Sequence, residues 1–198
     1  FKMYYDALPI GKHRARNMYN TDGAVFGEVI SFWGTFTNNW YNFKSKNERE
    51  KLKDRFGLTL YQQSAIELSA MMLDYFDHTG DRDFLRQTAL PFTREILSFF
   101  DQHYPTNAQG KLVMHPSQAL ETWWRCTNAA PELAGCIAVT ERLLAGAREL
   151  PLGSSFTAAD IDTARQLGYD DGLRQGREDG RVEGAQAAEV HGQPADFQ

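Results

Sequence analysis

The sequence of 198 residues is poor in cysteine, with Cys126 and Cys136 as the only two. Ten positions separate them, and they could form a disulfide bond. Two small buried thiols near the start of a helix are the favoured interpretation, because free cysteine behaves as a small apolar residue. The cysteines therefore do not indicate a redox compartment.

Long apolar runs and an excess of basic charge are also missing. No run approaches the roughly 18 residues that a membrane-spanning helix needs. The 21 Lys and Arg against 26 Asp and Glu give a net charge of −5, whereas a nucleic-acid-binding protein carries a basic excess. We therefore expect neither a nucleic-acid nor a membrane partner. No signal segment follows Phe1, so the compartment is unknown; a signal peptide on the full-length protein would make it secreted or periplasmic.

The sequence contains none of the short motifs that assign a common enzyme class. A Walker A loop, GxGxxG, GxSxG, HExxH and a CxxC pair are all absent. The five histidines show no spacing typical of metal ligands. We therefore expect neither a cofactor nor a metal ion.

The composition changes near residue 151. Residues 151–198 carry 4 basic and 9 acidic side chains, so the whole net charge of −5 arises there. This part also has a glycine at every fourth position, and each costs about 1 kcal/mol against alanine in a helix exposed to water. The glycines are Gly168, Gly172, Gly176, Gly180 and Gly184. We therefore predict a helical domain over residues 1–150 and a polar tail over residues 151–198 that is flexible or poorly ordered.

Apolar spacing predicts two neighbouring helices in the middle of the chain. Between residues 58 and 78, apolar side chains recur at intervals of three and four on two faces, which indicates a helix packed on both sides. The same spacing continues over residues 82–103, where Pro91 should kink or locally break the helix. Gly80 suits a left-handed helix end, and Asp81 can cap the next helix. The short link predicts an antiparallel helical hairpin.

A long loop and a third helix should follow. Residues 104–128 lose the helical period and gain prolines and a glycine, which indicates a loop with a short extended piece. Helical spacing resumes at Pro131, a favoured first-turn position, and stops before Pro151.

The N-terminal part is less regular. Residues 1–19 look helical, with Pro9 and Gly11 as interruptions. Residues 20–57 have the character of a loop and contain two of the four tryptophans. Long aromatic-rich loops between paired helices are often functional.

Two loop segments each place one glutamate among aromatic side chains. They are GAVFGEVISFWG at residues 23–34, with Glu28, and LVMHPSQALETWW at residues 112–124, with Glu121. Apolar surroundings raise the pKa of a carboxyl group, which suits it to protonate a leaving group near neutral pH. Composition alone favours a plainer interpretation, in which the aromatic rings pack the helix ends and each glutamate caps a loop.

Four segments in succession carry a resemblance to a known superfamily. They read GAVFGEVISFWG, ELSAMMLDYFDHTGDRDFLRQTALPFTREILSFFDQHYP, GKLVMHPSQALETWW and PELAGCIAVTERLLAG. Over about residues 1–150 the chain resembles the six-hairpin glycosidases, and within them a bacterial group similar to family 95 and family 65 glycoside hydrolases. The resemblance implies an all-α fold, an (α/α)6 toroid of antiparallel helical hairpins, with the sugar site at a mouth formed by long inter-helix loops.

Length limits how much of such a toroid the chain can hold. Residues 58–150 spend 93 residues on three helices. At that rate twelve helices would need roughly 370 residues. This is far more than the chain has, even if the other connections are shorter. We therefore expect an incomplete toroid, about a third to a half, with exposed helical faces that favour self-association. The isolated chain is expected to be inactive, because a catalytic partner can lie outside it.

The resemblance further implies hydrolysis of a glycosidic bond by two carboxyl groups, with a carbohydrate as the substrate. Glu121 is the first candidate for the catalytic acid, and Glu28 is the second catalytic candidate. Candidates for the wall that contacts the sugar are Trp33, Trp123, Trp124 and His115. Two alternatives stay open: a non-catalytic all-α carbohydrate-binding or scaffold module, and a polysaccharide lyase on a similar toroid, which would favour Tyr and His over paired carboxylates.

Overall fold

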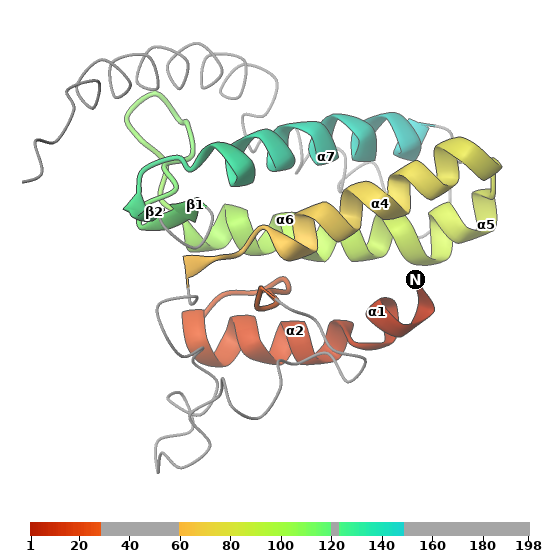
Figure 1. The fold of residues 1–198 in the computed structure, drawn as a ribbon, viewed down its shortest axis with the longest axis horizontal. Helices are drawn as coiled ribbons and strands as arrows, with labels where there is room; N and C mark the ends of the chain where they lie inside the picture. The colour runs from red at the N-terminus through yellow and green to blue at the C-terminus, as the bar shows by residue number, and fades with distance from the viewer. Residues whose placement is uncertain (29–59, 120–122, 149–198) are drawn as a thin grey trace, which may run out of the picture.

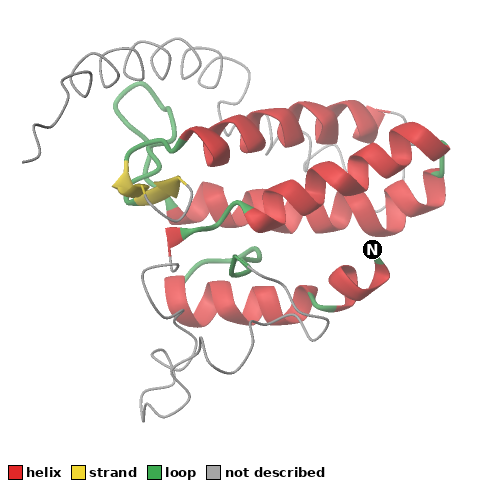
Figure 2. Ribbon diagram, in the orientation of Figure 1, coloured by secondary structure: helices red, strands yellow, loops and turns green. Residues whose placement is uncertain are grey.

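The computed structural model describes residues 1–28, 60–119 and 123–148, and these residues form a layered set of helices with one small β-hairpin (Figures 1 and 2). The long helices are α4 (Ser64–Thr79), α6 (Leu90–His103) and α7 (Ala130–Arg148). The shorter elements are α1 (Lys2–Asp6), α2 (Leu8–Arg14), the π-helical turn η1 (Ala15–Tyr19), α5 (Arg82–Phe84), the π-helical turn η3 (Leu85–Ala89), β1 (Ser117–Ala119) and β2 (Trp123–Cys126). No helix among the described residues is long and apolar enough to cross a bilayer.

Helices α4, α6 and α7 share one core, and α2 lies along the other side of α6 and α4 (Figure 1). Helix α6 contributes the largest buried side chains, and α4 buries residues on two faces, as its spacing predicts. The largest side chains that are less than 2% exposed include Phe92, Phe99, Phe100, Ile66, Met72 and Leu85. Burying a side chain of this size stabilises the fold by roughly 1.5–3 kcal/mol.

The α4–α5 turn follows the prediction closely, but the start of α4 does not. Gly80 adopts the left-handed conformation with φ 66°, and the Asp81 carboxylate accepts a hydrogen bond from the Phe84 backbone N–H at 2.9 Å. Helix α4 begins at Ser64 rather than near residue 58, because Gln62 lies in a non-helical turn with its side chain buried. A long-range contact of Gln62 therefore overrides the local helical pattern.

Pro91 perturbs its helix without breaking it. Helices α5 and α6 are joined by the π-helical turn η3, so the chain stays helical from Arg82 to His103. Pro91 has no N–H to donate, and its ring would crowd the carbonyl group four residues earlier in a regular α-helix. A wider π-turn just before the proline relieves that crowding, which is the local perturbation expected from the sequence.

The N-terminal helices are present, but the predicted interruptions are wrong. The break between α1 and α2 falls at Ala7, whereas Pro9 occupies the first turn of α2, where its missing N–H is tolerated. Gly11 also lies within α2. A Cβ on Gly11 would lie 2.8 Å from the Phe26 ring, so this glycine permits close packing rather than ending the helix.

Helix α7 begins at Ala130 with Pro131 in its first turn, as expected, and its described part ends at Arg148. Residues 104–128 form the predicted loop, and its extended piece is the β1–β2 hairpin. The predicted polar tail and the predicted stop before Pro151 lie outside the described residues. The division into a domain and a tail at residue 150 therefore stays a prediction.

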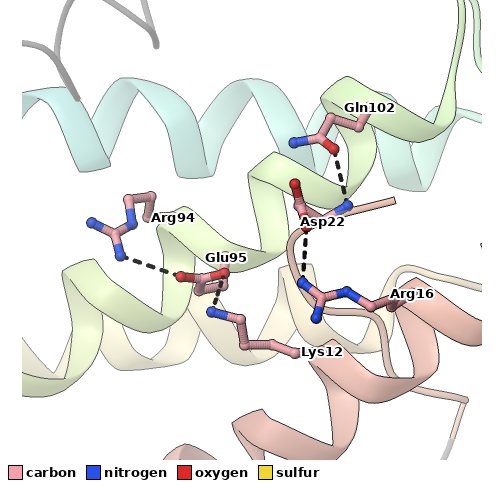
Figure 3. A network of polar contacts seen from close by, with 6 residues as sticks. All are labelled: Lys12, Arg16, Asp22, Arg94, Glu95 and Gln102. Atoms are coloured by element: carbon pink, nitrogen blue, oxygen red, sulfur yellow. Dashed lines mark hydrogen bonds and ion pairs between the residues drawn. The ribbon is translucent and has the colours of Figure 1, made fainter. Parts of the chain in front are cut away.

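Residues 20–28 run from η1 across α6, and a polar network fixes them there (Figure 3). The Asp22 backbone N–H donates to Gln102 Oε1 at 2.9 Å, and the Ala24 N–H donates to the Glu95 carbonyl group at 2.8 Å. The Glu95 carboxylate also pairs with Lys12 of α2 at 2.9 Å. The segment that leads to Glu28 is therefore held to α6 by backbone and side-chain contacts.

Replacement of Gly23 by alanine should displace this segment. A Cβ there would lie 2.4 Å from the Phe99 nitrogen and 2.5 Å from the Glu95 oxygen, at a φ of +77°. We expect Gly23→Ala to lower the free energy of unfolding by about 2–4 kcal/mol in urea denaturation.

Gly80→Ala is the matched control, because its φ is +66° and a Cβ there would meet nothing within 4 Å. It should cost only about 1 kcal/mol, the penalty for a left-handed residue. Equal losses for the two variants would contradict the role of the backbone contact at Gly23.

Candidate functional site

The β1–β2 hairpin lies at the end of the helices where α6 finishes and α7 begins, opposite the α4–α5 turn (Figure 1). Its strands are antiparallel, with Ser117 opposite Cys126 and Ala119 opposite Trp123. Glu121 belongs to residues 120–122, between the two strands, which lie outside the described residues.

Asn128 closes the base of the hairpin. Its side-chain Oδ1 accepts a hydrogen bond from the Met114 backbone N–H at 2.9 Å, and its own N–H donates to the Met114 carbonyl group at 2.9 Å. Asn128 has a φ of 52°, a left-handed conformation that asparagine tolerates better than most residues. Two hydrogen bonds to one residue therefore fix where the hairpin leaves and rejoins the helices.

Glu28 lies at the same end of the molecule, by the start of α4. The Ser64 hydroxyl group donates a hydrogen bond to the Glu28 carbonyl oxygen at 2.8 Å, which fixes the backbone of Glu28 beside the first residue of α4. Its side chain is half-buried. Glu28 lies outside any helix or strand, as expected, and Phe26 is buried two positions earlier, while the position of the Glu28 side chain among aromatic rings stays a prediction.

The Tyr104 hydroxyl group connects the hairpin to the start of α4. It donates to Gln62 Oε1 at 2.9 Å and lies 3.3 Å from the Pro116 carbonyl oxygen, just before β1. Gln62 stands two residues before Ser64, which contacts Glu28. A chain of hydrogen bonds therefore brings the backbone of Glu28 and the base of the hairpin to one end of the helices.

The proposed wall residues are only partly described. Trp123 in β2 is 60% exposed, an unusual position for a side chain of this size and one that leaves its ring face open for stacking. His115 is exposed, with its Nδ1 3.0 Å from the Thr127 hydroxyl group. Trp124 belongs to β2, but its side chain, like all of Trp33, lies outside the described residues.

Sequence reasoning missed Glu132, a carboxyl group buried in the first turn of α7 below the hairpin. Its side chain is 0% exposed. Burial is the main cause that raises the pKa of Glu132 from 4.5 to about 7, and the negative charge of Glu67 contributes to the same rise. The backbone N–H groups of Glu132 and Gln62 approach the carboxyl group closely enough to lower its pKa in part, without reaching the geometry of a full hydrogen bond. An acidic residue in a first turn signals only a favourable helix dipole, so the sequence gives no sign of this burial.

The described residues contain no group of histidine, cysteine, aspartate and glutamate side chains that could hold a metal ion. Cys126 and Cys136 are both free thiols. Cys136 is buried in α7 as expected, whereas Cys126 is half-buried in β2. The disulfide alternative is therefore wrong.

Comparison with known proteins places the chain among glycoside hydrolases. The family model described as the glycosyl hydrolase family 95 catalytic domain matches residues 1–145. A solved structure titled "Putative kojibiose phosphorylase from human microbiome" is similar to the chain, with a TM-score of 0.59 and 14% sequence identity over 82% of this chain. No curated protein matches the chain.

The structural likeness shows the fold alone, and it confirms the all-α six-hairpin toroid. This chain covers 23% of that relative, so the matched helices correspond to one portion of the toroid.

Replacement of Asn128 should loosen the hairpin. Asn128→Ala removes one hydrogen bond, worth roughly 0.5–1.5 kcal/mol, and adds a left-handed penalty of roughly 1–2 kcal/mol. We expect faster amide hydrogen exchange in β1 and β2, measured by mass spectrometry. Asn128→Gly keeps the backbone conformation but loses the acceptor, so its exchange should be intermediate.

Asn107→Ala is the control for this change. Asn107 Oδ1 also accepts from two backbone N–H groups, those of Gln109 and Lys111, but it does so in an exposed turn away from the hairpin base. The exchange of β1 and β2 should stay at the wild-type rate in Asn107→Ala. Acceleration in that variant would show that hairpin exchange reports general loosening rather than the contact of Asn128.

Proposed function

Because the chain belongs to glycosyl hydrolase family 95 through its catalytic domain, we propose that it takes part in hydrolysing a glycosidic bond with a pair of carboxyl groups. Glu121 is the proposed catalytic acid, and Glu28 is the proposed second carboxyl group. The substrate is a carbohydrate, as the family implies. The whole protein's activity is part of this proposal, since the chain covers 23% of its structural relative.

The observation that best supports this function is the chain of hydrogen bonds through Tyr104. It joins the base of the hairpin, whose two strands flank Glu121 in the sequence, to the start of α4, where Ser64 holds the Glu28 backbone. Glycoside hydrolysis needs two carboxyl groups about 5–9.5 Å apart, on opposite sides of the scissile bond. Two loops fixed to the same helix ends are a suitable frame for such a pair.

The proposed chemistry divides the work between the two groups. A protonated carboxyl group gives its proton to the leaving oxygen, while a carboxylate on the other side activates water. An acid of this kind works near neutral pH only if its pKa is raised, which apolar neighbours such as tryptophan rings achieve. Trp123, exposed in β2, would stack on the apolar face of a sugar ring and orient it.

Replacement of Glu121 by glutamine in the whole protein tests the proposed acid. Glutamine keeps the shape but cannot donate a proton, so turnover should fall by roughly 100–10,000-fold, the usual contribution of general acid catalysis. Release of reducing ends from a panel of glycosides measures turnover, and circular dichroism checks the fold. Glu141→Gln removes an exposed charge from α7 and serves as the control with wild-type activity.

The products separate this function from its alternatives. Hydrolysis releases a reducing sugar without added phosphate, and a requirement for phosphate with release of a sugar phosphate would show phosphorolysis instead. An unsaturated sugar that absorbs in the ultraviolet would show a lyase. Unchanged turnover in Glu121→Gln would remove Glu121 from the mechanism, and the same result in Glu28→Gln would remove Glu28.

We also propose that the chain by itself associates through apolar side chains exposed on α4. Met71 is 56% exposed and Tyr75 is 39% exposed, one turn apart on that helix. Apolar surface left in water forfeits roughly 25 cal/mol per Å2, which association recovers.

Light scattering after size-exclusion chromatography should therefore show a concentration-dependent mass for the 198-residue chain. Met71→Lys should shift it toward the monomer, because it places a charge in the apolar contact. Lys111→Gln, a change in the exposed turn after α6, should leave the mass distribution unchanged. A monomer at all concentrations would contradict association through α4.

A further inference from the structure

Buried polar side chains gather beneath the β1–β2 hairpin, where the helix ends meet it. Gln62 and Gln63 come from the turn before α4, Ser117 from β1 and Glu132 from the first turn of α7. Gln62 Nε2, Gln63 Oε1 and both carboxyl oxygens of Glu132 are buried with no hydrogen-bond partner among the described residues. Tyr104 reaches the same cluster through its hydroxyl group. Buried polar atoms without partners are costly, so a concentration of them beside a candidate site indicates a function beyond packing.

Among the described residues, the side-chain charge that acts on the Glu132 carboxyl group is itself negative. The charge of Glu67 on α4 acts on it directly, and Glu132 in turn affects the Tyr104 phenol and the Cys136 thiol one turn along α7. Burial raises the pKa of the Tyr104 phenol and of the Cys136 thiol, so both stay neutral at physiological pH. Deprotonation of Glu132 would therefore place an unbalanced negative charge in the cluster.

The neutral form of Glu132 suits this surrounding better than the ionised form. Both carboxyl oxygens of Glu132 are buried and have no hydrogen-bond partner among the described residues. An ionised carboxylate at that position would be a buried charge without a partner, which costs far more than a buried neutral acid. The protonation state of Glu132 thus decides whether the surface beneath β1 is neutral or contains an unpaired negative charge.

We propose that Glu132 is a positioning residue for the hairpin, holding β1 against the ends of α4 and α7 while it is protonated and releasing it when it ionises. Its effect on the hairpin is a property of this chain and does not depend on catalysis. Its effect on turnover rests on the proposed function, because it would act through Glu121, which follows β1 in the sequence.

The direction of the pH effect follows from proton linkage. The folded chain binds a proton at Glu132 up to a pKa of about 7, whereas the unfolded chain loses it near 4.5. The folded state therefore holds more protons in this window, and its stability falls as pH rises through it. Below pH 4.5 Glu132 is neutral in both the folded and the unfolded state, so the free energy of unfolding no longer contains a penalty from its ionisation.

The first experiment follows the wild-type protein without any substitution. Nuclear magnetic resonance of 13C-labelled glutamate should give Glu132 a midpoint well above 4.5, near 7, and the amide signals of β1 and β2 should titrate with the same midpoint. A Glu132 midpoint near 4.5, or hairpin signals that ignore the titration, would overturn the proposal. This measurement stays decisive even if substituted variants fold poorly.

The second experiment uses Glu132→Gln, which has the shape of the neutral acid and cannot ionise. Between pH 5 and 8 the wild-type melting temperature should fall by several degrees while that of Glu132→Gln stays level. Glu141→Gln, an exposed glutamate on the same helix, should retain the wild-type fall. Parallel slopes for wild type and Glu132→Gln would overturn the proposal.

In the whole protein, the alkaline limb of kcat should move to higher pH in Glu132→Gln, with KM little changed. An alkaline limb that is unmoved while the hairpin still titrates would show that the hairpin's position does not govern turnover. That result would count against the proposed function alone. The effect of Glu132 on the hairpin is tested separately, by the first two experiments.

Discussion

One buried hydroxyl group, that of Tyr104, holds together the parts on which the candidate site depends. Tyr104 is 4% exposed at the end of α6, and it joins Gln62 before α4 to Pro116 before β1. These three segments are far apart in the sequence and carry no regular secondary structure where they meet. A hydrogen bond that is protected from water is stronger than an exposed one, so this contact can specify a single arrangement of the loops.

The helices could be predicted because their information is local. The spacing of apolar residues gave α4, α6 and α7, and Gly80 with Asp81 gave the turn between α4 and α5. The errors occurred where a distant contact outweighed the local pattern. Gln62 stays outside α4 and contacts Tyr104, so the helix begins later than its spacing predicts, and Gly11 stays within α2, where the Phe26 ring packs against it. Neither partner can be identified from spacing.

The sequence could suggest candidate residues for the site, but not the residues that hold its loops in place. Glu28 and Trp123 were singled out because each lies in an aromatic-rich loop segment that resembles the six-hairpin glycosidases, and their roles stay predictions. Asn128 and Glu132 did not stand out, because their roles arise from a left-handed backbone and from complete burial. An acid in the first turn of a helix is ordinarily a surface residue, so only the packing of the hairpin distinguishes Glu132. Glu121 and Trp33 lie outside the described residues, and their roles stay predictions.

Because residues 20–28 are attached to α6, that helix sets the distance between the two loops of the candidate site. The segment leading to Glu28 is fixed at Glu95, through the Ala24 N–H, and the hairpin is fixed at Tyr104 where the same helix ends. At 1.5 Å and about 100° per residue, the stretch between these two points sets both the distance and the rotation between the two loops. A single insertion within it would swing one loop about the helix axis relative to the other. Additions to the exposed turn at Asn107 would leave both attachments in place. The chain therefore tolerates a change in length after Tyr104, in the exposed turn at Asn107, but not before it, within the part of α6 between Glu95 and Tyr104.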